Sequence, residues 1–217
     1  MTTSRTAKRT TKARSTGEVR RLENLWSGEF GQAYTERNAK AGAGRQKFWH
    51  SVVRLTRPQR VLEVGCNLGA NLRAFAGVMP PRELWGIDLN EHALTQLRTR
   101  LAGVNGVHGA ARDLPFRDGW FDLAFTCGVL IHQPPQALPL VMSEVVRVSR
   151  RFVLAAEYAA KEPTEVPYRG HSGALFKRDF GALYRELFPQ LTQRRTGFLG
   201  SDQGFDDVTW WLFEKQA

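Results

Sequence analysis

The chain has 217 residues, of which 42% are hydrophobic and 24% are charged, and its formal net charge is +10. This composition is typical of a folded globular domain and excludes fibrous and wholly disordered chains. No apolar run reaches the roughly 20 residues that a membrane helix needs, and the N-terminus lacks the apolar segment of a signal peptide, so we expect a cytoplasmic protein. Its two cysteines, Cys66 and Cys127, are too few for a disulfide framework and are expected to stay reduced.

The positive charge is concentrated at the N-terminus. Residues 1–21 hold seven basic residues and one acidic residue, so residues 22–217 carry only +4. Because the first stretch has few apolar residues, we predict a disordered basic tail over 1–21 and a single domain over 22–217. A basic excess that lies mostly in a tail makes nucleic acid an unlikely partner for the domain itself.

Helical patterns come first in the predicted domain. Apolar and aromatic residues recur at helical spacing from Val19 to Tyr34, and residues 46–55 give another helical pattern that ends before Pro58. We therefore predict a helical cap over residues 22–56.

Strands then alternate with helices. The predicted strands cover residues 60–64, 83–89, 104–110, 121–131 and 151–158, and the predicted helices cover 69–79, 90–101, 134–149 and 176–188. Such alternation indicates an α/β fold whose parallel sheet is covered on both faces. Residues 191–215 read as two strands with no helix between them, which predicts an antiparallel end to the sheet.

The stretch "RVLEVGCNLGA" of residues 60–70 suggests a ligand site. Its strand ends in the pattern E-x-G-x-x-x-G, with Glu63, Gly65 and Gly69, and with Asn67 where a glycine often stands. Ligands of open α/β sheets bind beyond the carboxyl ends of the strands, and glycines let the backbone approach them closely. A carboxylate here would repel a pyrophosphate, so the pattern favours a ligand that offers a cation or hydrogen-bond donors.

Acidic residues also follow the next two strands. Asp88 ends the second strand, where a carboxylate can accept hydrogen bonds from both hydroxyls of a ribose, and Asp113 follows the third. Together with Glu63 they describe an adenosine pocket without a phosphate site.

With these motifs the chain resembles class I S-adenosylmethionine (SAM)-dependent methyltransferases. "VLEVGCNLGANL", "LWGIDLN", "ARDLPF" and "FDLAFTCGVLIH" are similar to their first four motifs, over about residues 60–160. The resemblance implies a Rossmann-like seven-stranded sheet of order 3-2-1-4-5-7-6 with its last strand antiparallel, and SAM as cofactor. It implies cofactor contacts at Glu63, Gly65, Cys66, Asn67, Gly69, Asp88, Leu89, Asp113, Leu114 and Cys127, and at Tyr34 and Arg37 of the cap, with Arg37 on the SAM carboxylate.

A further resemblance covers most of residues 24–215. "NLWSGEFGQAYTERN", "GVLIHQPPQALP", "EYAAKEPTEVPYRGHSGALFKRDF" and "DDVTWWLFEK" are similar to methylases associated with pseudaminic acid biosynthesis. The resemblance implies a small polar acceptor, such as an amino-sugar or a sugar-bearing metabolite.

The acceptor is expected beyond the fourth and fifth strands. There we predict catalytic roles for His132, Glu157 and His171, and substrate contacts from Tyr158, Tyr168, Arg169 and Lys177. Positioning of the nucleophile supplies much of the rate of methyl transfer, so no metal is required, and the histidines do not cluster as ligands would.

Other functions stay open at this point. The acceptor could be an amine, guanidine or carboxylate of an antibiotic pathway, with Glu157 holding a cation or Arg169 and Lys177 holding an anion. An RNA-binding methyltransferase is less favoured because the chain has no basic and aromatic stripe outside the tail. Methylation at oxygen or at nitrogen is not decided, and a homodimer is possible.

Overall fold

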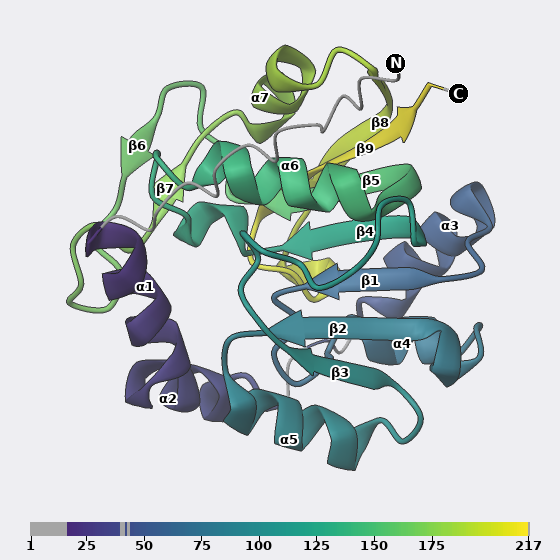
Figure 1. Ribbon diagram of the computed structural model, residues 1–217, viewed down its shortest axis with the longest axis horizontal. Coiled ribbons are helices and arrows are strands. Elements are labelled where there is room, and N and C mark those ends of the chain that lie inside the picture. The colour runs from purple at the N-terminus through teal and green to yellow at the C-terminus, as the bar shows by residue number, and fades with distance from the viewer. Residues whose placement is uncertain (1–16, 40–41, 43, 217) are drawn as a thin grey trace, which may run out of the picture.

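The computed structural model describes residues 17–39, 42 and 44–216, and its centre is a seven-stranded sheet (Figure 1). The strands lie in the order β3-β2-β1-β4-β5-β9-β8. They are β1 (Val61–Val64), β2 (Leu84–Asp88), β3 (Asn105–His108), β4 (Phe121–Cys127), β5 (Ser149–Glu157), β8 (Leu191–Leu199) and β9 (Val208–Lys215).

The pairing of these strands confirms the predicted sheet. Strands β1 to β5 are parallel to one another, whereas β9 runs antiparallel to both β5 and β8. Counted along the chain as seven strands, this is the order 3-2-1-4-5-7-6 with an antiparallel last strand. The carboxyl ends of β1, β2, β4 and β5 therefore meet at one edge, where a ligand of such a fold binds.

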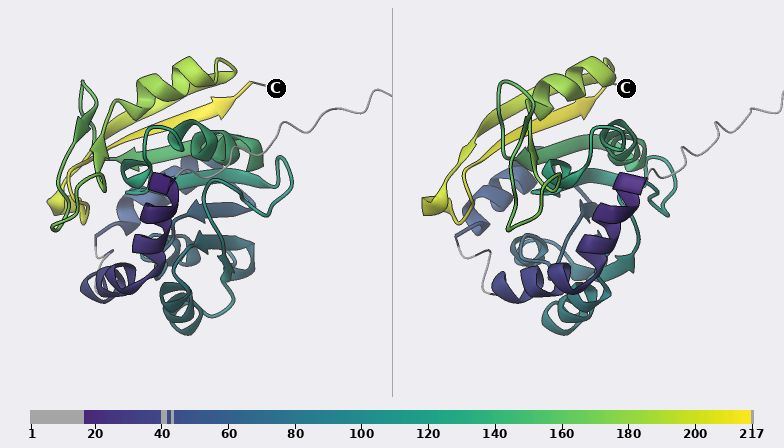
Figure 2. Two further views of the ribbon diagram at one scale, coloured as in Figure 1. Left: turned by 60° about the vertical axis from the view of Figure 1, so that its left-hand side comes forward. Right: turned by 90° about the vertical axis from the view of Figure 1, so that its left-hand side faces the viewer.

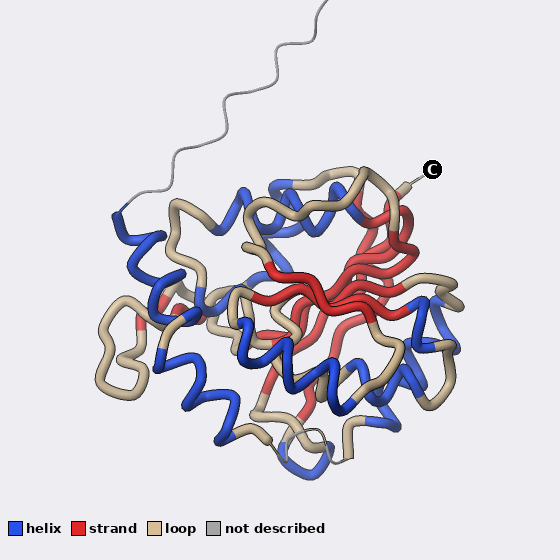
Figure 3. Tube along the Cα trace, turned by 60° about the horizontal axis from the view of Figure 1, so that its bottom comes forward, coloured by secondary structure: helices blue, strands red, loops and turns tan. Residues whose placement is uncertain are grey.

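Helices cover both faces of the sheet, as Figure 3 shows in blue against the red strands. They are α1 (Gly17–Ser27), α2 (Glu29–Arg37), α3 (Gln46–Thr56), α4 (Leu72–Ala76), α5 (Glu91–Arg100), α6 (Leu138–Val148) and α7 (Phe180–Leu187). Three short 3-10 helices are η1 (Pro81–Glu83), η2 (Leu130–His132) and η3 (Ser201–Gln203). None of the helices within the described residues is long and apolar enough to cross a membrane.

The core is divided by the sheet into two clusters. Apolar residues of α3, α4 and α5 pack on one face, and those of α6 and α7 pack on the other. Side chains of a strand alternate between the faces, so Leu62 and Val64 of β1 lie with α6, while Val61 lies with α3 and α4. The same alternation turns Glu63 toward the face of α3 and α4, where a carboxylate needs a specific partner.

The structure corrects three boundaries at the ends of the predicted elements. Helix α1 begins at Gly17 and buries Val19, so the predicted tail over 1–21 is too long by at least five residues, and residues 1–16 lie outside the described part. The helical pattern of 19–34 is two helices, separated at Gly28, the N-cap of α2. The helix predicted from Phe176 begins only at Phe180, because the Asp179 side chain accepts the Ala182 N–H and caps it.

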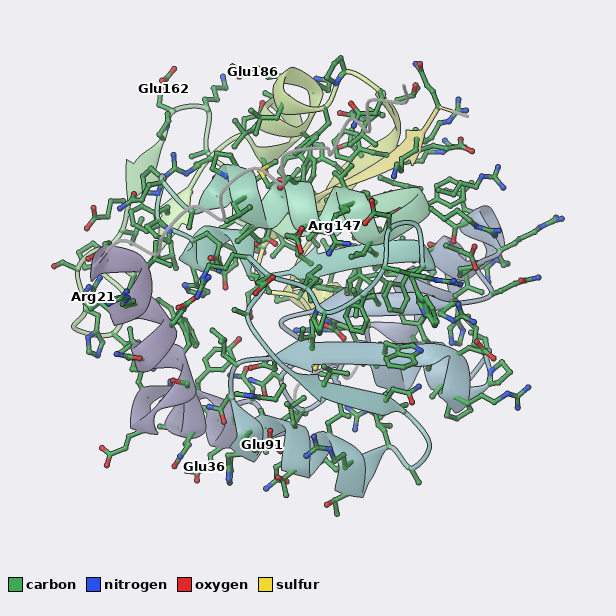
Figure 4. The ribbon with its side chains drawn as sticks, in the orientation of Figure 1. Arg21, Glu36, Glu91, Arg147, Glu162 and Glu186 are labelled. Carbon is green, nitrogen blue, oxygen red and sulfur yellow. The ribbon has the colours of Figure 1, made fainter. Side chains whose placement is uncertain are left out.

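Residues before this cap form a small sheet that the sequence patterns did not predict. Strand β6 (Thr164–Glu165) pairs antiparallel with β7 (Phe176–Lys177), and the connection between them lies beside α1 (Figure 2). The Arg21 guanidinium donates to the backbone carbonyls of Ser172 and Gly173, at 3.1 and 3.0 Å (Figure 4). Helix α1 and the β6–β7 segment, residues 164–177, thus form one layer over the edge of the sheet.

Candidate functional site

A cavity of about 180 Å³ lies at the carboxyl ends of β1, β2, β4 and β5. Eleven of the residues predicted for the site line it. They are Tyr34, Glu63, Gly65, Cys66, Asn67, Asp88, Leu89, Cys127, His132, Tyr158 and Tyr168. Eight others do not line it, namely Arg37, Gly69, Asp113, Leu114, Glu157, Arg169, His171 and Lys177.

The turn after β1 brings the backbone close to the cavity. Gly65 has a φ of +73°, and a Cβ there would lie 2.4 Å from Cγ2 of Val129. Asn67 also has a positive φ, +47°, and its side-chain oxygen accepts the N–H of Leu68 at 2.7 Å. Asparagine tolerates the left-handed region better than most residues. A side chain with a local hydrogen bond thus replaces the glycine that this position often has.

Asp88 connects two loops at the cavity. One carboxylate oxygen accepts the N–H of Asn67 at 2.7 Å and the other accepts the N–H of Asn90 at 2.9 Å. Burial raises the pKa of Asp88, while these amide donors lower it. An ionised carboxylate has about four acceptor positions, so Asp88 keeps capacity for a further donor such as a ribose hydroxyl.

Glu63 is fully buried and only half satisfied. Its Oε1 accepts a hydrogen bond from Nδ2 of Asn71 at 2.7 Å, but Oε2 has no hydrogen-bond partner among the described residues. Burial raises the pKa of Glu63 to about 8. A buried carboxylate oxygen without a donor is costly, so this position fits a ligand that carries a cation or a hydrogen-bond donor.

Arg45 is the arginine of this cavity, in place of the predicted Arg37. Its Nη1 donates to Oδ1 of Asn71 at 2.9 Å, and its Nε donates to the carbonyl of Gly204 at 2.7 Å. Arg37 instead stacks over the ring of Phe30, 5.9 Å from the ring centroid. The prediction of Arg37 came from the resemblance of residues 33–37 to a cap helix that closes over SAM, whereas Arg45 lies in an irregular turn that carries no such resemblance.

His132 is held as a neutral imidazole at the wall of the cavity. Its Nδ1 is 2.6 Å from the carbonyl of Ala174, which can only accept, so Nδ1 carries the proton and Nε2 has a free lone pair. The ring packs 4.4 Å from that of Trp26, and burial lowers the pKa of His132 to about 4. This geometry keeps a proton acceptor available at neutral pH.

Glu157 does not face the cavity, contrary to its predicted contact with the acceptor. Its Oε2 accepts the N–H groups of Val129 and Ile131 at 3.0 and 3.4 Å. Burial raises the pKa of Glu157 to about 7, although these amides favour the ionised form. The carboxylate binds the turn that carries His132, and so its position supports the site from outside.

Aromatic side chains form the wall opposite the sheet. Trp26, Tyr34 and Tyr168 line the cavity together with His132, and the ring centroids of Trp26 and Tyr34 are 5.3 Å apart. The bidentate ion pair of Arg112 with Glu23, at 2.5 and 3.2 Å, fixes α1 to the segment after β3.

Three predicted acceptor residues belong to the outer surface of the β6–β7 segment. Arg169 stacks at 5.9 Å from the centroid of the Tyr168 ring, and the His171 ring lies edge-on to Phe30 at 4.9 Å. Lys177 lies over the ring of Tyr158, 5.7 Å from its centroid. None of the three lines the cavity, so their grip on an anionic acceptor stays a prediction that this arrangement does not support.

The predicted adenine contacts, Asp113 and Leu114, do not line the cavity. Leu114 is buried in the core, where its N–H donates to Oε2 of Glu144 at 2.8 Å, and Asp113 is also absent from the lining. Gly109 and Ala111 line the cavity instead. The motif was correctly placed after β3, but the small residues before Asp113 approach the cavity.

The lining residues that the sequence patterns missed include the polar and charged residues Arg45, Asn71 and Asp206. Asn71 follows the glycine turn closely enough that its spacing from Glu63 could have suggested it. Asp206 lies in an irregular loop before β9 and carried no signal. Within the described residues, no group of three or more His, Cys, Asp or Glu side chains could hold a metal ion.

Comparisons with known proteins find similarity over the central part of the chain. Residues 61–151, less than half of the chain, match the family described as "Methyltransferase domain". A fatty-acid O-methyltransferase of Mycolicibacterium smegmatis is 37% identical over 94 residues, which are 42% of this chain and 34% of that protein. The chain thus spans about a third of the length of this relative and of the next ones it matches.

Two solved structures share the fold over most of the chain. Magnesium protoporphyrin IX methyltransferase from Synechocystis PCC 6803, with bound SAH, superposes with a TM-score of 0.66 at 13% identity, covering 91% of this chain and 99% of that one. The 1,6-didemethyltoxoflavin-N1-methyltransferase of Burkholderia thailandensis gives a TM-score of 0.70 at 14% identity, covering 91% and 90%. The predicted Rossmann-like class I methyltransferase fold is confirmed, and residues 61–151 match the methyltransferase-domain family.

Proposed function

We propose that the protein transfers a methyl group from SAM to a small polar acceptor, on an oxygen or a nitrogen atom. The observation that carries the proposal is the set of carboxylates at a cavity without a phosphate-binding loop. Glu63 and Asp88 lie there at the ends of adjacent strands, and both keep acceptor positions for a ligand. Such a cavity fits a nucleoside with positive charge better than a nucleotide with phosphates.

The donor set supports particular roles for the residues around SAM. Asp88 would accept hydrogen bonds from the ribose hydroxyls, and the unpartnered oxygen of Glu63 suits the ammonium of the methionine part. Arg45, held by Asn71 and Gly204, would bind the carboxylate in place of Arg37. SAM supplies an activated methyl group, and the chain has to bind it and orient the acceptor.

His132 would act on the acceptor as a general base. Its Nε2 is free of a proton because Nδ1 donates to Ala174. A neutral imidazole next to the acceptor can accept the proton that an oxygen or nitrogen nucleophile loses. His132 is the remaining candidate among the three predicted catalytic residues, since Glu157 and His171 lie outside the cavity lining.

The finer assignments remain proposals. A sugar-like acceptor rests on the resemblance to the methylases associated with pseudaminic acid, while the relatives include an enzyme named for a fatty acid. An amine or guanidine of an antibiotic pathway is the alternative acceptor. A cytoplasmic location and a homodimer are retained as expectations, and RNA remains the least favoured substrate.

Calorimetry with SAM tests the proposed function directly. We expect wild-type protein to bind SAM, and Asp88→Ala to lose most of the affinity because two ribose hydroxyls lose their acceptor. Asp113→Ala is the matched control, since this aspartate does not line the cavity. Equal losses in both variants, or binding of NAD or ATP in preference to SAM, would contradict the assignment. Acceptor identity would follow from a mass gain of one methyl in a panel of amino-sugars, nucleoside sugars and guanidino compounds.

A further inference from the structure

Asn90 makes hydrogen bonds to three different elements around the candidate site. It is 4% exposed and lies in the turn between β2 and α5. Its backbone N–H donates to Oδ1 of Asp88 at 2.9 Å, and its side-chain Oδ1 accepts the N–H of Ala93 at 3.2 Å and so caps α5. Its Nδ2 donates to the carbonyl of Trp26 at 3.1 Å. The residue thus connects the carboxylate proposed to bind the ribose with the end of α1.

The bond to Trp26 provides a donor that α1 itself does not have. Trp26 is the second-last residue of α1, and the last four carbonyls of a helix have no partner within the helix. Gly31 of α2 packs against this bond, since a Cβ there would lie 2.6 Å from Nδ2 of Asn90. Helix α2 also lies beside α5 (Figure 1). The missing side chain at Gly31 therefore leaves room for the Asn90 amide at the junction of the three helices.

The Trp26 ring belongs to the aromatic wall of the cavity. Its centroid is 4.4 Å from that of the His132 ring and 5.3 Å from that of Tyr34. The other side of His132 is held by the carbonyl of Ala174, which accepts from Nδ1. A shift of the end of α1 would therefore change the packing around the proposed general base.

The other contacts that hold α1 lead to different parts of the molecule. Arg112 pairs with Glu23 and fixes α1 to the segment after β3, while Arg21 donates to carbonyls of the β6–β7 segment. Within the described part of the chain, Asn90 is the residue whose hydrogen bonds join the turn after β2 to α1.

From these contacts we propose that Asn90 is a positioning residue that couples the two halves of the site. With SAM at Asp88 the turn after β2 is fixed, and the Asn90 amide then holds the end of α1 so that Trp26 packs against His132. This inference rests on the proposed function, because it takes SAM as the ligand at Asp88. It goes beyond that function, since it predicts that cofactor binding orders the acceptor side of the cavity before the acceptor binds.

Hydrogen exchange followed by mass spectrometry tests the coupling without knowledge of the acceptor. Exchange is measured in protein alone and in protein saturated with S-adenosylhomocysteine. In wild type we expect this ligand to slow exchange in the turn after β2 and also in α1, in α1 by roughly fivefold, the lower end for coupling between two sites. Asn90→Ser keeps an N-cap for α5 and the backbone N–H to Asp88, but it lacks the amide donor. It should keep the protection of the turn and lose most of that in α1.

The ratio of exchange rates with and without the ligand separates coupling from a general loss of stability, because a weaker fold exchanges faster in both states. Asn90→Asp is the second variant: it keeps the size and the capping oxygen but has no N–H, so it should behave like Asn90→Ser. Arg100→Gln is the matched control. Arg100 of α5 donates to the carbonyl of Ala39 after α2 at 2.8 Å, a bond that does not involve the turn after β2. This variant should keep the wild-type ratio in α1.

Three results would overturn the proposal. The first is protection of the turn after β2 in wild type without protection of α1. The second is a wild-type ratio in a folded Asn90 variant, since the ligand would then act on α1 directly. The third is loss of the ratio in Arg100→Gln, which would assign the coupling to α5 as a whole. Failure of S-adenosylhomocysteine to bind wild-type protein would instead overturn the proposed function.

Discussion

At the scale of single residues, Arg45 lines the cavity, whereas Arg37 of α2 does not. Its two hydrogen bonds to Asn71 and Gly204 fix the guanidinium beside Glu63. We expect Arg45→Gln to lower the affinity for SAM roughly 10- to 100-fold, the range for loss of a hydrogen bond to a charged group. Arg37→Gln should bind SAM like wild type in the same calorimetric titration. If Arg37→Gln lost more affinity for SAM than Arg45→Gln, Arg37 of α2 would be the residue that binds the SAM carboxylate.

His132 gives the protein a defined dependence of stability on pH. Its pKa is about 4 in the folded state and near 6.5 when unfolded, so between these values the unfolded chain binds the additional proton. The contribution is constant above pH 6.5, and stability falls as the pH drops toward 4, by about 3 kcal/mol in total. Urea unfolding of wild type and His132→Asn at pH 7.5 and pH 5 measures this contribution of His132 to the free energy of unfolding.

The comparison with His132→Asn controls for the other groups that titrate between pH 5 and pH 7.5. Carboxyl groups with raised pKa values, such as Glu63, act in the opposite direction over part of this range, since they favour the folded state at low pH. Both proteins contain them, so the difference between wild type and His132→Asn isolates the histidine. If the difference in free energy of unfolding between wild type and His132→Asn were the same at pH 7.5 and pH 5, His132 would be exposed to water in solution.

At the scale of elements, the 3-10 helix η2 depends on Glu157. The Glu157 carboxylate accepts the amides of Val129 and Ile131 at the start of the turn that carries His132. Glu157→Ala leaves these donors without their acceptor, and we expect a loss of about 1–3 kcal/mol in the free energy of unfolding and slower turnover. Glu157→Gln keeps an acceptor oxygen, so it should retain most of the stability and most of the turnover. A variant Glu157→Ala with normal stability but no activity would favour direct contact with the acceptor.

The junction of α1 and α2 is the second element on which the site depends. A Cβ at Gly31 would lie 1.8 Å from the carbonyl oxygen of Trp26 and 2.6 Å from Nδ2 of Asn90, which donates to that carbonyl. Gly31→Ala should therefore displace α1 and its aromatic wall, with a loss of about 1–3 kcal/mol and weaker SAM binding. At Gly17, the first residue of α1, a Cβ meets nothing within 4 Å, so Gly17→Ala is the control.

Regular elements could be read from the sequence, whereas the irregular ones that complete the site could not. The buried runs of β1, β4 and β5 have the apolar character of parallel strands, and their order in the chain predicts that their ends meet. Arg45 and Asp206 lie in irregular segments, where no periodicity shows which way a side chain points. Glu157 was misplaced for a different reason: a carboxylate at a strand end suggests a ligand, but the amides of the next turn already satisfied it.

At the scale of the whole molecule, the net charge divides between the N-terminus and the folded part. Residues 1–16 hold five basic residues and no acidic one, which is half of the net charge of +10. On the folded part, five arginines line a groove of about 1040 Å³ at the opposite edge of the sheet from the candidate site. Two carboxylates, Glu83 and Asp122, share that groove, and Asp122 pairs with Arg150. The basic charge of the folded part is thus partly compensated within the molecule.

This distribution predicts the result of removing residues 1–16, a boundary set by the start of α1 at Gly17. The shortened chain should bind SAM and unfold like the full chain, because it keeps every described residue that lines the cavity. Any affinity of the full chain for single-stranded RNA should fall, and the slope of log affinity against log salt should decrease by roughly 0.7 for each RNA phosphate that the shortened chain no longer neutralises. If affinity and slope stay unchanged, the arginine groove carries the binding, and RNA regains its place among the candidate substrates.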